Sequence, residues 1–143
     1  MKLTPNFDSS EFTCKCGCGQ CKINERLVER LQLLRYKVGK PVIINSGYRC
    51  PTHSVRVGGS YNDAHTNGIA ADICVNGISS VQLARIAEDL NFGGIGIIDN
   101  NSIHVDIRDE NGCGFTYANS HWWGDERASS RTDYILSFKH YSR

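Results

Sequence analysis

Two short apolar runs separated by a long polar stretch constrain the fold of this chain most. Residues 41–45 (PVIIN) and 69–75 (IAADICV) are apolar and contain β-branched side chains, so each is predicted to form a core strand. Residues 46–68 between them are rich in Gly, Ser and Asn, and are too polar for a core. The sequence therefore predicts a long polar loop beside two strands, where a functional site is expected because loops on a rigid scaffold carry function.

Two helical patterns accompany these strands. Asn24 begins the first, in which leucines recur at spacings of four and three residues before Gly39, which is placed to end the helix. Ser79 or Ser80 can cap the second, whose apolar side lies within residues 81–90. Each helix should bury its apolar face against the strands.

The second half of the chain adds a predicted β-hairpin. Residues 94–98 and 102–108 are two strand-like runs around a polar turn, whereas residues 112–143 are aromatic-rich and stay unassigned. The order of elements predicts an α+β fold with a small antiparallel sheet and helices on one side. A length of 143 residues is expected to form one domain.

Composition excludes several classes of protein. Sixteen basic and fifteen acidic residues give a net charge of +1, which argues against nucleic acid as the partner. There is no apolar run of about 18 residues, so no membrane span is expected. No apolar stretch follows the first lysine, which predicts that the chain has no signal peptide and is made in the cytoplasm.

The seven cysteines are unevenly distributed. Four fall within eight positions and can supply thiolates to a structural metal, although their spacing is tighter than in the usual zinc knuckle: Cys14, Cys16, Cys18 and Cys21. Either Cys50 or Cys113 can join such a site. Buried free thiols or an opportunistic disulfide are the alternatives.

A second group of residues has the chemistry of a catalytic zinc site. His65 at the end of the polar loop and Asp72 on the following strand can meet at one point, since Gly68 allows a sharp turn between them. His104 and Asp106 alternate on the hairpin strand and face the same side. Imidazole and carboxylate ligands with an open fourth position suit catalytic zinc. The alternative interpretation is that these are unrelated surface histidines and solvated aspartates.

Several motifs in order resemble one family. They are EFTCKCGCG (11–19), SGYRC (46–50), VGG (57–59), HTNGIAAD (65–72) and HVDIR (104–108). Together they resemble the zinc D-Ala-D-Ala carboxypeptidase family of LAS-type metallopeptidases, which includes murein endopeptidases and phage endolysins and has the hedgehog domain as a distant structural relative. The resemblance covers roughly residues 7–108 and implies a hedgehog/DD-peptidase-like fold.

The resemblance also implies roles for individual residues. His65, Asp72 and His104 match the three zinc ligands of the family. Arg49 matches an arginine that holds the substrate's carboxylate or a peptide carbonyl, for which a guanidinium fork is suited. A structural arginine that braces the loop is the other interpretation of Arg49.

Two positions depart from the family's pattern. Relatives place a Glu, Asp or His two or three residues before the last zinc histidine, where this chain has Ser102 and Asn101. Asp106 is therefore predicted to be the general base, with Asp99 as the second choice; alternatively, Asp106 is the third ligand and His104 orients substrate or water. Asp63 stands where relatives carry serine, and either fixes the tautomer of His65 or is a solvated loop residue.

Taken together, these features predict a monomeric zinc-dependent peptidase acting on peptidoglycan stem peptides. A phage lysis protein, or a virion component that acts at the cell wall, is the expected setting. Two alternatives remain: a non-catalytic zinc-binding relative, which the missing upstream base favours, and a zinc-ribbon-like interaction module built on the N-terminal cysteines.

Overall fold

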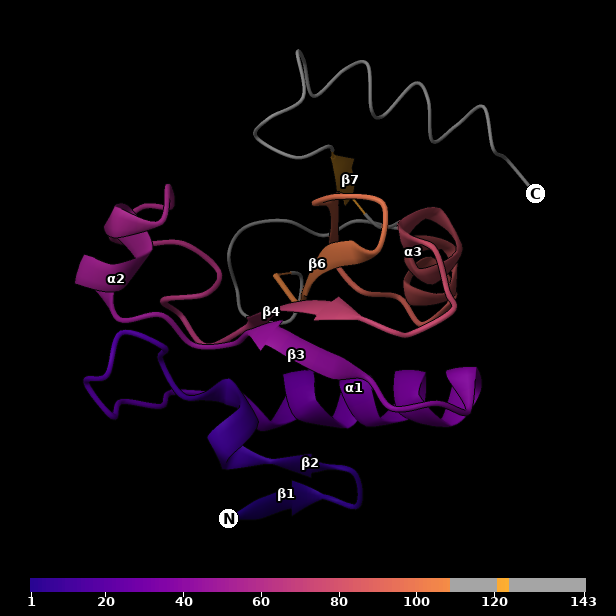
Figure 1. Cartoon of the computed structure of the whole chain (residues 1–143), viewed down its shortest axis with the longest axis horizontal. Helices are drawn as coiled ribbons and strands as arrows, with labels where there is room; N and C mark the ends of the chain where they lie inside the picture. Colours follow the sequence, from indigo (N-terminus) through magenta and orange to yellow (C-terminus); the bar gives the residue numbers. More distant parts are fainter. Residues whose placement is uncertain (109–120, 124–143) are drawn as a thin grey trace.

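The computed structural model describes residues 1–108 and 121–123, and these residues form an α+β fold (Figure 1). Within these ranges, β1 (Lys2–Thr4) and β2 (Phe7–Asp8) form a small hairpin. A larger sheet has the strand order β3-β4-β6-β5-β7. Its strands are β3 (Ile43–Ser46), β4 (Ala70–Cys74), β5 (Gly94–Ile97), β6 (Ser102–Asp106) and β7 (His121–Trp123). The described helices are η1 (Ser9–Phe12), α1 (Glu25–Val38), α2 (Pro51–Arg56) and α3 (Ser80–Asp89).

The ends of the two longer helices follow from local capping chemistry, as predicted. The Asn24 side chain accepts a hydrogen bond from the backbone N–H of Arg26 and begins α1. Gly39 ends α1 in the left-handed conformation, with φ of 67°. Ser79 caps α3 through a reciprocal capping box with Gln82.

Strand alternation gives the larger sheet two chemically different faces. On one face, Ile73, Ile103 and Val105 are fully buried in the apolar core. Asp72, which precedes Ile73, and His104, which lies between Ile103 and Val105, point to the other face. These two residues lie directly opposite each other in the antiparallel pairing of β4 with β6. The sheet therefore separates a core face from a polar face.

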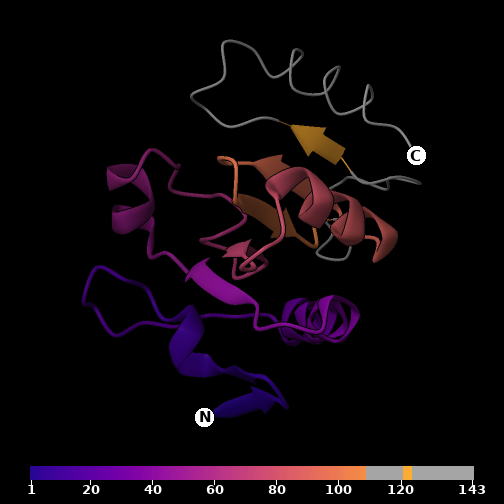
Figure 2. The same cartoon turned by 45° about the vertical axis from the view of Figure 1, so that its right-hand side comes forward.

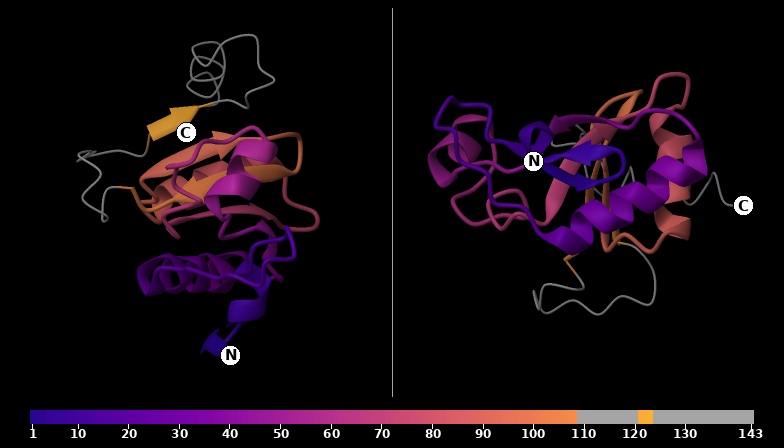
Figure 3. Two further views of the ribbon diagram at one scale, coloured as in Figure 1. Left: turned by 90° about the vertical axis from the view of Figure 1, so that its left-hand side faces the viewer. Right: turned by 90° about the horizontal axis from the view of Figure 1, so that it is seen from below.

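Two helices cover the core face. Leucines of α1 and residues of α3 belong to the same buried cluster as the apolar side chains of β4, β5 and β6. Figure 3 shows α1 and the N-terminal hairpin on the same side of the sheet, and Figures 1 and 2 place α2 at the opposite end of the molecule from α3. The arrangement of α1 and α3 agrees with the predicted antiparallel sheet with helices on one side.

Some elements were not predicted. The polar stretch 46–68 contains α2, and the N-terminal hairpin and η1 precede the first predicted helix. The unassigned segment 112–143 contributes β7, which pairs with β5 in parallel; its other residues, including Cys113, lie outside the described part of the chain. No helix in the described residues is long and apolar enough to cross a membrane.

Candidate metal centre

Three predicted ligands meet on the polar face of the sheet. Asp72 and His104 come from the centres of β4 and β6, and His65 comes from the turn that leads into β4. The His65 Nε2 and Asp72 Oδ1 atoms are 3.2 Å apart, and His104 Nδ1 lies 3.3 Å from each of them. The three donor atoms thus form a nearly equilateral triangle.

This triangle has the size that a zinc ion requires. Ligand atoms about 2.0–2.1 Å from a tetrahedral zinc lie about 3.3 Å from one another. Two imidazoles and one carboxylate are also the donor set of catalytic zinc sites, in which the fourth position stays open to water. The residues present therefore fit the metal in both chemistry and spacing.

Hydrogen bonds orient both imidazoles toward the same point. His65 Nδ1 is 2.8 Å from the carbonyl oxygen of Gly47, to which it can donate, and this leaves Nε2 for a metal. His104 Nε2 is 2.7 Å from Asp106 Oδ2, which leaves Nδ1 for a metal. Such partners select the tautomer of a metal ligand and hold its ring in place.

Asp106 is fully buried behind His104. Its Oδ1 accepts from the backbone N–H and Nε of Arg108 at 3.0 and 2.9 Å, and its Oδ2 accepts from Arg108 Nη2 at 2.7 Å. Gly94 on β5 leaves the space for this carboxylate, because an added Cβ would lie 2.6 Å or less from its carbon and both of its oxygens. Both carboxylate oxygens are therefore occupied by Arg108 and His104.

The charges around His104 act against the cost of burial. Burial lowers the pKa of His104, but its hydrogen bonds to Asp106 and Asp72 outweigh this effect and raise the pKa to about 9. For Asp72 and Asp106, burial acts in the opposite direction and raises the pKa. The hydrogen bonds from His104 outweigh it and keep the pKa of both carboxyl groups well below the usual range. Both carboxylates are consequently ionised in the folded protein.

Arg49 lies beside the ligand triangle. Its Nη2 donates to Asp72 Oδ2 at 3.0 Å and its Nε donates to Ser46 Oγ at 3.1 Å. Among the residues that the structure describes, Nη1 has no hydrogen-bond partner. The guanidinium is thus held next to the site with one nitrogen available for another group.

The two remaining carboxylates have local structural roles. Asp63 accepts hydrogen bonds from Ser54 Oγ and from the backbone N–H groups of Ser60 and Thr66, and so organises the loop before His65. Asp99 lies exposed in the turn between β5 and β6, where its Oδ1 accepts from the backbone of Asn101 and Ser102. These hydrogen bonds of Asp63 and Asp99 therefore serve the backbone of their own loop and turn.

The cysteines form a second group, in which one member differs from the predicted set. The thiols of Cys14, Cys16 and Cys18 come together with that of Cys50. Cys21 is the one that falls outside: its Sγ points to the carbonyl oxygen of Ser9 at 3.7 Å. The sequence leaves open whether Cys50 joins the group, and in the structure Cys50 takes the place that is expected for Cys21.

An α+β domain that brings together two imidazoles and a carboxylate, from two strands of its sheet and the adjoining turn, has the ligand set of a zinc hydrolase. Comparison with known proteins agrees: the family described as Peptidase M15 matches residues 5–106, and the chain belongs to this family. It is also 36% identical over 64 residues to the zinc D-Ala-D-Ala carboxypeptidase of Streptomyces albus G. That match covers 44% of this chain and 25% of the relative, so the chain corresponds to only part of that protein.

Proposed function

We propose that this chain is a zinc-dependent peptidase that cleaves peptidoglycan stem peptides. The observation that carries the proposal is the triangle of His65, Asp72 and His104, whose donor atoms are 3.2–3.3 Å apart. The printed activity of the relative, a zinc D-Ala-D-Ala carboxypeptidase, supports the substrate class. Membership of a peptidase family supports the reaction class.

The three residues of the triangle would hold the metal, and their neighbours prepare them for it. A zinc ion with three protein ligands lowers the pKa of a bound water and polarises the carbonyl of a peptide. The Gly47 carbonyl and the Asp106 carboxylate each contact one nitrogen of an imidazole, and the other nitrogen of each ring faces the metal position. These contacts exist before a substrate arrives, so the site is preorganised.

Arg49 is proposed to bind the substrate. A stem peptide of the D-Ala-D-Ala type ends in a carboxylate, and a guanidinium is the side chain best suited to hold one. The contacts to Asp72 and Ser46 fix the plane of the guanidinium, while Nη1 remains available. Arg49 would therefore place the scissile bond beside the metal ligands.

For Asp106, the geometry favours a positioning role over the proton-accepting role that the sequence suggested. A general base must reach the proton that it removes, and it works best when its pKa is near the operating pH. The Asp106 carboxylate is fully buried, its oxygens are occupied by Arg108 and His104, and its pKa is far below neutrality. We propose that it acts through His104 by fixing the orientation of that ligand.

The test is digestion of purified peptidoglycan by the zinc-loaded protein, followed by mass analysis of the released fragments. Loss of a terminal D-Ala identifies a carboxypeptidase, and release of shorter peptides or uncoupled cross-links identifies an endopeptidase. Zinc removal by a chelator should stop either reaction, and added zinc should restore it. If the zinc-loaded protein cleaves no stem peptide, the peptidase proposal fails and a non-catalytic zinc-binding relative takes its place.

The finer proposal of an endolysin-like activity has a separate readout. An enzyme that cuts within the cross-linked peptides weakens the wall, so it should lower the turbidity of a suspension of isolated cell walls. Trimming of terminal D-Ala residues leaves the mesh intact and the turbidity unchanged. A fall in turbidity would therefore support a role in phage lysis, and an unchanged turbidity with released D-Ala would contradict it.

A further inference from the structure

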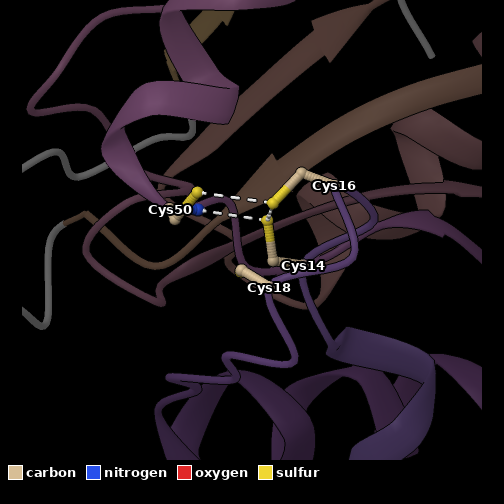
Figure 4. A group of neighbouring side chains, drawn as sticks. All are labelled: Cys14, Cys16, Cys18 and Cys50. Carbon is tan, nitrogen blue, oxygen red and sulfur yellow. Dashed lines mark hydrogen bonds between the residues drawn. The ribbon is translucent and has the colours of Figure 1, made fainter.

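Four cysteines from two distant segments meet at the base of the long polar loop (Figure 4). Cys14, Cys16 and Cys18 come from the segment after η1, and Cys50 immediately precedes α2. We propose that these four thiols, here called the thiol cluster, bind a structural Zn²⁺ ion as thiolates. This site is separate from the His65–Asp72–His104 triangle and would add a second metal to the protein.

The spacing of the sulfur atoms supports this assignment. Zinc–sulfur bonds of about 2.3 Å at tetrahedral angles separate the sulfurs by about 3.8 Å. Cys14 Sγ and Cys16 Sγ are 3.4 Å apart, Cys16 Sγ and Cys50 Sγ are 3.7 Å apart, and all four atoms lie within 4.8 Å of one another. A disulfide needs about 2.05 Å, so the thiols are grouped at the distance of shared metal ligands and not at that of a covalent bond.

The backbone of the first segment is folded so as to bring alternate cysteines together. In an extended strand, side chains two residues apart point to one side but lie about 7 Å from each other. Gly17, between Cys16 and Cys18, instead adopts a φ of 92°, in the left-handed region that glycine enters without strain. A hydrogen bond of 2.8 Å from the Cys14 N–H to the Gln20 carbonyl closes this loop.

Backbone contacts also bring the second segment to the cluster. The Cys50 N–H donates to the Cys14 sulfur at 3.3 Å, as it would to a metal-bound thiolate. The Tyr48 N–H donates to the Phe12 carbonyl at 2.9 Å. Gly47 approaches Phe12 so closely that an added Cβ would lie 2.7 Å from its Cα. Backbone contacts alone therefore hold the two segments next to each other.

The thiol cluster lies next to the segment that serves the ligand triangle. Gly47 accepts the hydrogen bond from His65, and the Arg49 N–H donates to the His65 carbonyl at 3.4 Å. Arg49 itself directly precedes Cys50. Four protein ligands leave no open position for water, which is typical of structural zinc. The ion would therefore fasten the Gly47–Cys50 segment to the N-terminal segment without taking part in the reaction.

The test is a count of zinc in the purified full chain, prepared under reducing conditions. The wild type should carry two zinc ions, Cys16→Ser one, and His65→Ala one. Cys21→Ser is the matched control, because Cys21 is an exposed cysteine of the same loop outside the thiol cluster, and it should keep both ions. Cys16 is itself exposed, so its substitution does not disturb the core.

Cobalt substitution of the wild type provides a second measurement. Thiolate-bound Co²⁺ should give intense near-ultraviolet charge-transfer bands, which persist in His65→Ala and disappear in Cys16→Ser. An unchanged zinc content in Cys16→Ser would overturn the proposal. So would absence of these bands in the wild type, or a mass showing that two of the four thiols have lost their protons to a disulfide. A peptidase that proves inactive but still shows the bands would leave this site standing, so the two proposals fail separately.

Discussion

The ligand triangle and the thiol cluster are built in opposite ways. The triangle draws two of its three residues from paired strands, and each imidazole is already held by a hydrogen bond to a second group. The thiol cluster draws all four residues from loops, and two of its cysteines, Cys16 and Cys18, are exposed. A site with three protein ligands must keep its shape while the fourth position is used, so it needs a rigid frame. A site with four ligands can be completed by the ion itself.

The loss of each proposed ion should therefore have a different consequence. Removal of the ion at the triangle should stop the chemistry and leave the sheet unchanged, because β4 and β6 are held by their own pairing and by the core. Removal of the ion at the thiol cluster should loosen the N-terminal loop and the Gly47–Cys50 segment.

The largest expected effect is the loss of one ligand of the triangle. His65→Ala, Asp72→Ala and His104→Ala should each lower the zinc content by one ion and abolish peptidoglycan cleavage, because a three-ligand site does not survive the loss of a ligand. Plasma emission and the fragment assay measure the two properties. His53→Ala, which removes a histidine of α2 outside the triangle, is the control and should keep both ions. Full activity with unchanged zinc would remove the substituted residue from the site.

Removal of the Asp106 charge tests whether its contact with His104 supports metal binding. Asp106→Asn should weaken zinc binding by about 10- to 100-fold, since a buried partner that orients a histidine ligand is lost. Competition with a chromophoric chelator measures the affinity. Asp99→Asn should leave zinc binding and turnover unchanged, because Asp99 serves the β5–β6 turn. Unchanged zinc affinity in Asp106→Asn with turnover about 10²-fold slower would instead identify Asp106 as the general base.

A change at Arg49 tests substrate binding without altering the ligands. Arg49→Lys should retain zinc but lower kcat/KM about tenfold or more, because an ammonium group cannot reproduce the contacts of the guanidinium fork. Steady-state kinetics on a soluble stem peptide give the value. Arg56→Lys makes the same substitution at an exposed position of α2 and should not change kcat/KM. Wild-type kinetics in Arg49→Lys would show that Arg49 only braces the loop.

The sequence predicted those elements whose signals are local. The caps Asn24 and Ser79 and the leucine spacing define α1 and α3, and the apolar runs define β3 to β6. The polar helix α2 has no apolar stripe to reveal it. The parallel pairing of β7 with β5 joins segments far apart in the chain, and no local pattern encodes such a contact.

Part of the geometry around the ligand triangle could be predicted from the sequence. Strand alternation placed His104 and Asp106 on one face, and the same rule extended by two residues would have placed Arg108 beside Asp106. The Gly47 carbonyl that orients His65 could not be predicted, because a backbone contact across the loop leaves no trace in residue identity. The membership of Cys50 in the thiol cluster is likewise a tertiary contact, which spacing left open between Cys50 and Cys113.

The smallest expected effect concerns the loop that carries His65. Asp63→Asn replaces one of two acceptor oxygens that bind Ser54, Ser60 and Thr66, so it should lower the free energy of unfolding by about 1 kcal/mol. Urea denaturation of the zinc-loaded protein measures this value. Glu29→Gln on the exposed side of α1 removes the same charge and should change the free energy by less than about 0.5 kcal/mol. Because Asp63 has no described hydrogen bond to His65, the zinc content should stay unchanged in Asp63→Asn. If zinc is lost while the unfolding midpoint is unchanged, Asp63 supports the ligand directly and its loop contacts are secondary.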